Sequence, residues 1–426
     1  MERLFDAQTK GLPDVGAGIA LSDIGRRGWN VLHEDLPLPV AVLRESDLAN
    51  NARWMRGFVT RYGAKLAPHG KTTMSPELFR RQIEDGAWGI TVATVQQMRV
   101  ARAAGAKRVL LANLLIGARD IEYVLSALRE DPRLDFYCLV DSLAGARRLA
   151  EAALQQPVGR PLQVLLEIGY AGGRTGCRDI DTAISVARAV KAAHPRLALR
   201  GVEGFEGLVQ SLPAADAMPK VRALLDRVTS AAHLIDAEEL FDGNDVILSA
   251  GGSSYYDVVL EALSTVPLRK PASVITRSGC YLTHDSGLYR RGFSDILDRS
   301  AEARARAGAM RNALEVWCYV VSVPEEDRAI LGAGRRDFGH DAGPPVVLKR
   351  FRPGADKAPH AFEGSGEIVA INDQHAHFIF KPGVDIAVGD MVALGISHPC
   401  TTFDKWRLMY TVDDDYAVLH GIETYF

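Results

Sequence analysis

The sequence predicts an α/β protein, a closed (β/α)8 barrel that carries a C-terminal antiparallel β-domain. From residue 62 to about residue 280, short apolar or β-branched runs alternate with longer stretches of helical periodicity, which is typical of repeated βα units. After residue 280, short strand-like runs follow one another between Gly, Pro and Asp turns, with little helix. The chain has 426 residues, 47% of them hydrophobic, which is enough for two domains with large cores.

Eight runs in the first region read as strands, and seven helical stretches lie between them. The expected strands are Ala64–His69, Trp88–Ala93, Val109–Leu115, Asp135–Val140, Leu162–Ile168, Leu199–Phe205, Val246–Ala250 and Ala272–Arg277. The expected helices are Ser75–Gly86, Thr94–Ala104, Ala118–Arg129, Ser142–Leu154, Ile180–Ala193, Ala214–Ala232 and Tyr256–Leu263. This alternation favours a closed barrel over a doubly wound open sheet, which is the alternative architecture.

A ninth strand-like run, Val40–Leu43, precedes a helical stretch from Asp47 to Arg61, so one of the nine strands must lie outside the barrel. The Arg- and Ala-rich segment Ser300–Arg311 reads as a solvated helix. The strands expected in the second region are Ala313–Val323, Val346–Phe351, Glu367–Ile371, Ala376–Phe380, Met391–Leu394, Trp406–Thr411 and Ala417–Ile422.

The charge balance favours a small-molecule ligand over a nucleic acid. The formal net charge is -3 and the pI is near 6.4, whereas binding a phosphate backbone needs an excess of Lys and Arg. The five cysteines form no Cys-x-x-Cys pair, which is typical of reduced thiols. The N-terminus lacks the apolar core of a signal peptide, and no run of apolar residues is long enough to span a membrane, so we expect a cytoplasmic protein with no membrane partner.

Lys71 stands where catalytic groups of barrels gather, at the C-terminal end of the first expected strand, within Pro68-His-Gly-Lys-Thr72. A lysine in such a loop is often an ordinary surface residue. Here the turn is shaped by Pro68 and Gly70, and His69 lies beside an amine that needs a lowered pKa to form a Schiff base. Lys71 is therefore the candidate nucleophile, and His69 a candidate for proton transfer.

A glycine-rich turn follows the seventh expected strand and leads into a helix, through Gly251, Gly252, Ser253 and Ser254. Backbone N–H groups freed by glycine, a helix N-terminus and two hydroxyl groups together suit a phosphate. An ordinary capped turn would have the same sequence. We expect these four residues to bind a phosphate group.

Charged residues at two other strand ends are candidates for ligand contacts. Arg174, flanked by glycines after the fifth expected strand, is suited to a phenolate or a carboxylate. The sixth expected strand ends with Glu203 and Glu206. Two acids in an apolar strand are costly unless they are used, so we expect one of them to meet a cationic partner such as a pyridinium nitrogen. Glu203 shares a strand face with Phe205, and we prefer it to Glu206 for that role.

A possible metal pair lies near the C-terminus, where His398 and Cys400 are two residues apart. An imidazole and a thiolate can bind one zinc ion and leave positions open for a substrate. A purely structural pair is the alternative. His375 and His377 lie about twenty residues earlier, and His375 is a further candidate for proton transfer.

Taken together, these residues resemble the fold-type III enzymes that use pyridoxal 5'-phosphate (PLP), the alanine-racemase-like group. Within that group they are similar to the D-serine dehydratase and D-threonine aldolase family. The similarity begins at about residue 36 and rests on four segments in the same order. These are Pro68-His-Gly-Lys-Thr72 for the PLP lysine, Gly173-Arg-Thr-Gly176 near the PLP phenolate, Gly251-Gly-Ser-Ser254 for the phosphate, and Gly279-Cys-Tyr281 after the last strand.

The resemblance implies that Lys71 holds PLP, that Tyr281 contacts the cofactor, and that His398 and Cys400 bind a divalent metal, zinc or alternatively manganese. It also implies that the first strand joins the β-domain. The expected organisation is thus an extension over 1–35, the joining strand over 36–45, the barrel over 46–280 and the β-domain over 281–426. Ala67, Thr73 and Met74 differ from the residues that are common in the family at these positions, so the resemblance does not specify how the substrate is recognised. A homodimer is expected from the fold group.

The implied reaction is metal-assisted β-elimination on a D-3-hydroxy amino acid such as D-serine, which gives a 2-oxo acid and ammonia. Lys71 would remove the Cα proton while the metal activates the β-hydroxyl. A D-threonine-type aldolase that releases glycine and an aldehyde is the alternative. Dehydratases of the family pair the histidine with cysteine, and aldolases tend to pair it with aspartate, so Cys400 favours elimination. A racemase, a PLP-binding protein without turnover and a barrel without a cofactor are the remaining possibilities.

Overall fold

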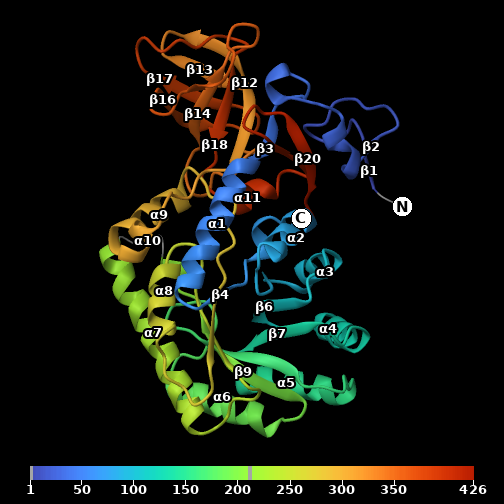
Figure 1. Cartoon of the computed structure of the whole chain (residues 1–426), viewed down its shortest axis with the longest axis vertical. Helices are drawn as coiled ribbons and strands as arrows, with labels where there is room; N and C mark the ends of the chain where they lie inside the picture. Colours follow the sequence, from blue (N-terminus) through green and yellow to red (C-terminus); the bar gives the residue numbers. More distant parts are fainter. Residues whose placement is uncertain (1–2, 210–213) are drawn as a thin grey trace.

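The protein consists of a barrel and a β-rich part that stack along the long axis of the molecule (Figure 1). The computed structural model describes residues 3–209 and 214–426. Residues 1–2, at the start of the expected N-terminal extension, and residues 210–213 lie outside the described residues.

The barrel contains eight parallel strands that follow the chain order around the sheet. They are β4 (Lys65–Leu66), β5 (Ile90–Val92), β6 (Arg108–Leu114), β7 (Asp135–Val140), β8 (Leu162–Ile168), β9 (Leu197–Gly204), β10 (Val246–Ser249) and β11 (Ala272–Thr276). The sheet closes between its two end strands, because His69 forms a parallel bridge with Thr91 and the Thr91 N–H donates to the Pro68 carbonyl at 2.9 Å. The prediction of a closed barrel is confirmed, and the open-sheet alternative is wrong.

Helices connect successive strands and cover the outside of the barrel (Figure 1). They are α1 (Glu45–Arg61), α2 (Pro76–Glu84), α3 (Val95–Ala103), α4 (Ala118–Glu130), α5 (Leu143–Gln155), α6 (Ile180–Ala192), α7 (Ala214–Ala237) and α8 (Tyr256–Leu263). Polar caps fix where several of them begin: the side chains of Thr94, Ser142 and Asp179 accept N–H groups in the first turns of α3, α5 and α6.

The first barrel strand is shorter than its sequence suggests. We expected a strand over Ala64–His69, whereas β4 spans only Lys65–Leu66. Pro68 has no N–H group for the sheet, and the chain then tightens into the single 3-10 turn η3 (Gly70–Thr72). The strand is cut short at the point where the chain turns toward the cavity described below.

The β-rich part is antiparallel apart from the pairing of β3 (Val40–Arg44) with β19. Its other strands are β12 (Leu314–Glu325), β13 (Arg328–Leu331), β14 (Val346–Phe351), β15 (His360–Ala361), β16 (Gly366–Ile371), β17 (Ala376–Phe380), β18 (Met391–Gly395), β19 (Leu408–Val412) and β20 (Val418–Glu423). The ninth strand of the sequence, β3, also pairs with β12 and so lies in this sheet and outside the barrel.

Helical structure after residue 280 differs from the prediction. The helix α9 (Leu288–Arg299) was not predicted, and the predicted helix Ser300–Arg311 is confirmed only over α10 (Ala301–Ala305). Beyond Ala305 the chain packs back on α1: the Asn51 amide donates to the Arg311 carbonyl at 2.7 Å and accepts the Arg311 N–H at 2.8 Å. These tertiary contacts replace the helical hydrogen bonds of the segment.

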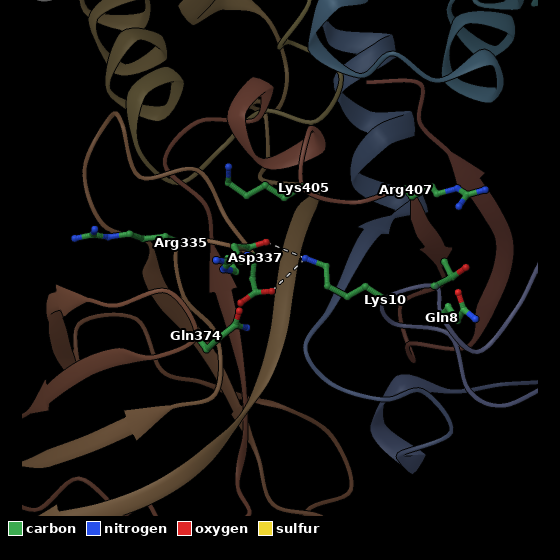
Figure 2. A pocket seen from close by; sticks show the side chains of 9 residues that line it. Gln8, Lys10, Arg335, Asp337, Gln374, Lys405 and Arg407 are labelled. Carbon is green, nitrogen blue, oxygen red and sulfur yellow. Dashed lines mark hydrogen bonds and ion pairs between the residues drawn. The ribbon is translucent and has the colours of Figure 1, made fainter.

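The N-terminal segment, which forms the short strands β1 (Leu4–Phe5) and β2 (Ile19–Ala20), packs beside the β-rich part (Figure 1). Lys10 anchors it, as Figure 2 shows. The Lys10 ammonium donates to the Arg336 carbonyl at 2.9 Å and to buried Asp337 at 3.2 Å, and lies 3.6 Å from the centre of the Trp406 ring. None of the helices in the described part of the chain is long and apolar enough to cross a membrane.

Candidate active site

A cavity of about 340 Å³ lies at the C-terminal ends of the barrel strands, where the β-rich part closes over the barrel. In barrels this end carries the ligand-binding loops. The cavity is lined by His69, Lys71, Thr72, Ala112, Glu167, Arg174, Glu203, Phe205, Gly207, Gly251, Gly252, Ser253, Arg277, Gly279, Cys280, Tyr289, His398 and Cys400. Most of the residues that the sequence analysis singled out therefore meet in one place.

Lys71 reaches the cavity from the turn η3, directly after β4. Gly70 is required at this turn, because a Cβ atom there would lie 2.8 Å from the Phe79 ring and 3.1 Å from Ile90. The chain therefore packs closely against α2 and β5 and leaves the Lys71 side chain exposed toward the cavity.

His69 provides a neutral imidazole beside Lys71. Burial lowers the pKa of His69 well below its usual value, and the positive charges of Lys71, Arg277 and Arg174 lower it further. Its Nδ1 atom is buried without a hydrogen-bond partner among the described residues. A buried polar atom of this kind is costly unless a ligand satisfies it.

Arg174 lies in a glycine-rich loop that Arg178 holds in shape. The Arg178 guanidinium donates to the carbonyls of Gly173, Arg174, Thr175 and Gly176 at 2.6 to 3.1 Å. The Arg174 guanidinium lies over the Phe205 ring, 5.1 Å from its centre, which is within the range of a cation–π interaction. The loop thus places a cation at the mouth of the barrel.

Glu203, at the end of β9, forms a buried ion pair with Arg277. The Arg277 Nη1 lies 2.8 Å from the Glu203 carboxylate, and the two side chains are only 4% and 1% exposed. Arg277 also donates to the Ser249 hydroxyl at 2.7 Å and to the Gly204 carbonyl at 3.0 Å. Burial raises the pKa of Glu203, and the positive charge of Arg277 opposes that rise.

The glycine-rich turn after β10 forms the opposite wall, with Gly251, Gly252 and Ser253 at the cavity surface. Both glycine N–H groups, which we expected to be free for a phosphate, donate to the Glu206 carboxylate, at 2.9 Å from Gly251 and 2.8 Å from Gly252. The sequence analysis preferred Glu203 and gave Glu206 no role.

Two cysteines and a histidine line the same cavity as Lys71, and two of them, His398 and Cys400, come from the β-rich part. Cys400 begins the short helix α11 (Cys400–Phe403), and its Sγ lies 3.5 Å from the hydroxyl of Thr72, the neighbour of Lys71 in the chain. The Cys280 Sγ lies 3.6 Å from the Cys400 Sγ. The C-terminal His-x-Cys pair is therefore part of the same site as the lysine.

His398 is oriented by Asp341, whose carboxylate lies 2.7 Å from the Nδ1 atom. Burial alone would lower the pKa of His398, but its contacts with Cys400 and Asp341 raise it to about 9. The contacts of Cys400 with Cys280 and His398 hold the pKa of the Cys400 thiol well below its usual value. Within the described residues, no group of three or more His, Cys, Asp or Glu side chains is arranged to hold a metal ion.

Three predicted site residues do not line the cavity. Ser254 is buried behind the turn, and its carbonyl accepts a hydrogen bond from Arg299. Tyr281 is 4% exposed, and its hydroxyl accepts a hydrogen bond from Gln82 at 3.5 Å on the side of α2. His375 is exposed in the turn between β16 and β17, because its backbone closes that hairpin with Asn372.

The lining residues that the sequence analysis gave no role include Arg277, Glu167 and Tyr289. Arg277 and Glu167 had a signal that could have revealed them, because each is a charged residue at the end of an apolar strand. Glu167 is 4% exposed and accepts a hydrogen bond from the Thr175 hydroxyl at 2.6 Å. Tyr289 lies on the unpredicted helix α9, so its position could not be anticipated.

The fold and the cavity define a (β/α)8-barrel protein whose β-domain completes a lysine-containing site. The family model described as "Alanine racemase, N-terminal domain" matches residues 43–256, half of the chain, and the chain belongs to that family. A second model, described as "Putative serine dehydratase domain", matches residues 313–412. The two matches confirm the resemblance inferred from the sequence.

Individual relatives match nearly the whole chain. A D-threonine aldolase from Arthrobacter sp. is 25% identical over 402 residues, which are 94% of this chain and 95% of the relative. The crystal structure of a D-threonine aldolase from Filomicrobium marinum matches with a TM-score of 0.76 at 20% identity and covers 93% of this chain and 97% of that chain. A D-threo-3-hydroxyaspartate dehydratase from Delftia sp. HT23 matches with a TM-score of 0.70 at 21% identity, over 93% and 99%.

Proposed function

We propose that the protein is a PLP-dependent, metal-assisted lyase that eliminates the β-hydroxyl group of a D-3-hydroxy amino acid such as D-serine, and so releases a 2-oxo acid and ammonia. One observation carries the proposal: the His398 and Cys400 pair of the β-domain reaches the same cavity as Lys71, with Cys400 3.5 Å from Thr72. The site thus combines an amine nucleophile with a soft metal-binding pair.

The residues present fit PLP. A cavity of about 340 Å³ is large enough for a small cofactor, and Lys71 supplies the amine that PLP enzymes use. The buried Nδ1 atom of His69 still needs a partner, and it lines this cavity. When bound, PLP acts as an electron sink that stabilises negative charge at the Cα atom of an amino acid.

Four groups around the cavity would hold the cofactor. Lys71 would bind it covalently, Arg174 would face its phenolate oxygen, and Ser253 would face its phosphate. The Glu203–Arg277 pair would face the ring nitrogen. Because Arg277 already compensates the Glu203 charge, the ring nitrogen would meet an ion pair and not an isolated carboxylate.

The site also fits a divalent metal in part. His398 uses Nδ1 for Asp341, as metal-bound histidines commonly do, and this leaves Nε2 for an ion. The contacts that lower the pKa of Cys400 favour the thiolate form that binds zinc. The chain supplies two ligands, so positions stay open for the substrate hydroxyl, and a D-threo-3-hydroxyaspartate dehydratase mutant has been solved in a metal-free form. Zinc suits this pair better than manganese, which prefers oxygen ligands.

The proton movements are assigned to Lys71 and His69. Lys71, once released by the substrate amine, would remove the Cα proton. We assign to the neutral imidazole of His69, which lines the same cavity, the exchange of a proton with the Lys71 amine. The metal on His398 and Cys400 would make the β-hydroxyl a better leaving group. The Cα proton and the β-hydroxyl would leave as water, and the dehydrated amino acid would take up one water to give the 2-oxo acid and ammonia.

Cleavage of the Cα–Cβ bond is the second candidate, because the D-threonine aldolase relative covers almost the whole chain. The same residues would then deprotonate the β-hydroxyl and release glycine and an aldehyde. The thiolate of Cys400, in place of a carboxylate, favours elimination. A PLP-binding protein without turnover would have no need for the β-domain pair.

Product analysis distinguishes these candidates. The purified holoenzyme, incubated with D-serine, D-threonine and D-3-hydroxyaspartate, is expected to release ammonia and a 2-oxo acid in equal amounts. Glycine and an aldehyde would instead show an aldolase. Because the metal activates the hydroxyl, a chelator or Cys400→Ala is expected to lower turnover by at least about 100-fold, within the range of a metal's electrostatic contribution.

Two further measurements complete this test. Adding back zinc should restore the chelated wild type but not the Cys400→Ala variant. Cys318→Ala, at a buried cysteine of the β-domain that does not line the cavity, is the matched control and should retain metal-dependent turnover. Full turnover in the presence of chelator would remove the metal from the proposed reaction.

A further inference from the structure

The Glu206 carboxylate makes an unusual contact with the wall of the cavity. It accepts the backbone N–H groups of two consecutive residues, Gly251 at 2.9 Å and Gly252 at 2.8 Å, one on each carboxylate oxygen. Glu206 itself is 1% exposed. A buried carboxylate is costly to keep ionised, and hydrogen bonds from N–H groups to both oxygens are the usual compensation.

The contact with Glu206 determines what the N–H groups of Gly251 and Gly252 can bind. The cavity is lined by Phe205, Gly207, Gly251, Gly252 and Ser253. Glu206, between Phe205 and Gly207 in the chain, is not one of the described residues that line it. The two N–H groups are thus directed at a buried carboxylate, and they are not free to bind a ligand in the cavity.

The conformation of the turn needs such support. Gly251 has φ of +102°, and a Cβ atom at this position would lie 2.9 Å from the Thr276 hydroxyl. Glycine loses more conformational entropy than any other residue when it is ordered. The side chain that fixes both glycines lies two residues beyond the end of the neighbouring strand, β9 (Leu197–Gly204), so Glu206 joins the turn to the rigid barrel.

We propose that Glu206 is a positioning residue for the phosphate of the cofactor. It occupies the two glycine N–H groups and so fixes the turn with Ser253 facing the cavity. The phosphate is then bound by the N–H and hydroxyl groups of Ser253, and not by Gly251 and Gly252. This inference rests on the proposed function, because it takes PLP as the ligand.

The test compares two ligands that differ only in the phosphate. PLP and pyridoxal, which lacks the phosphate, are titrated into the apoenzyme, and the absorbance of the lysine-bound cofactor is followed. In Glu206→Gln the amide oxygen can still accept the N–H group of one glycine. The amide nitrogen is itself a donor, so it cannot accept the N–H group of the other glycine. We expect PLP to bind at least roughly ten-fold more weakly and pyridoxal to bind within about two-fold of wild type, because one charge-assisted hydrogen bond is lost.

The controls separate this inference from the proposed function. Glu261→Gln, at an exposed glutamate on α8, should leave both affinities unchanged. If the wild type binds neither ligand, the proposed function fails. If the wild type binds PLP and Glu206→Gln binds it equally well, or loses both ligands to the same extent, the inference about Glu206 fails alone. Ser253→Ala should show the same phosphate-specific loss, and an unchanged affinity for PLP in this variant would overturn the assignment of the phosphate to Ser253, whether or not Glu206→Gln folds.

Discussion

Replacement of Lys71 by alanine is expected to abolish the visible absorbance of a bound cofactor and to lower turnover by at least about 10³-fold. The side chain is assigned both the covalent attachment and the transfer of the Cα proton, and a positioned acid or base alone contributes about 10²- to 10⁴-fold. The measurements are the absorption spectrum of the purified protein after incubation with PLP and the initial rate of 2-oxo acid formation.

Lys65→Ala is the matched control for this variant. Lys65 lies in β4, the short strand that precedes Lys71, but its ammonium is exposed, donates to the Ser273 hydroxyl at 3.0 Å and does not line the cavity. This variant should retain both the spectrum and the rate. An unchanged spectrum in Lys71→Ala would contradict the central assignment, whatever its effect on turnover.

Arg277→Met is expected to lower the free energy of unfolding of the apoenzyme by about 3–5 kcal/mol, the cost of leaving one member of a buried ion pair without its partner. The variant leaves the Glu203 carboxylate, which is 1% exposed, without its counter-ion. It also removes the hydrogen bonds that Arg277 donates to Ser249 and Gly204. Urea denaturation of the apoenzyme measures the effect without a contribution from cofactor binding.

Two comparisons isolate the contribution of burial. The double variant Arg277→Met with Glu203→Gln should recover a large part of the lost stability, because no uncompensated charge stays buried. Arg188→Met breaks a bidentate pair with Glu238 on the protein surface and should hardly move the denaturation midpoint, because water solvates both groups. Equal losses in the two single variants would show that Glu203 and Arg277 are not a buried, coupled pair.

The positions of the strands were predictable because their physical cause is local. Alternating apolar and helical runs reflect which residues must be buried on a parallel sheet, and barrel strands place their C-terminal ends at one rim. Lys71, Arg174, Glu203 and Ser253 lie at or beyond the C-terminal ends of separate strands, so the closure of the barrel is enough to bring them together. Their common cavity follows from periodicity and chain order.

Pairwise contacts between side chains were decided only by the tertiary structure. Glu203 and Glu206 look equivalent in the sequence, two acids three residues apart, yet one pairs with Arg277 and the other holds the glycine turn. Which partner each acid meets depends on the side-chain direction and on residues more than forty positions away. The sequence analysis expected one acid at this strand end to meet a cationic partner, but it could not identify Arg277 or the glycine turn as the groups that these acids contact.

The sequence by itself determined the barrel, the β-domain and the segment that carries Lys71, because burial and turn formation act between residues close in the chain. Only the tertiary structure decided that Cys400 lies 3.5 Å from Thr72, that Tyr281 points toward α2, and that His375 is left outside on an exposed turn. The β-domain docks on the barrel through contacts between residues hundreds of positions apart, and such packing leaves no periodic signal in the sequence.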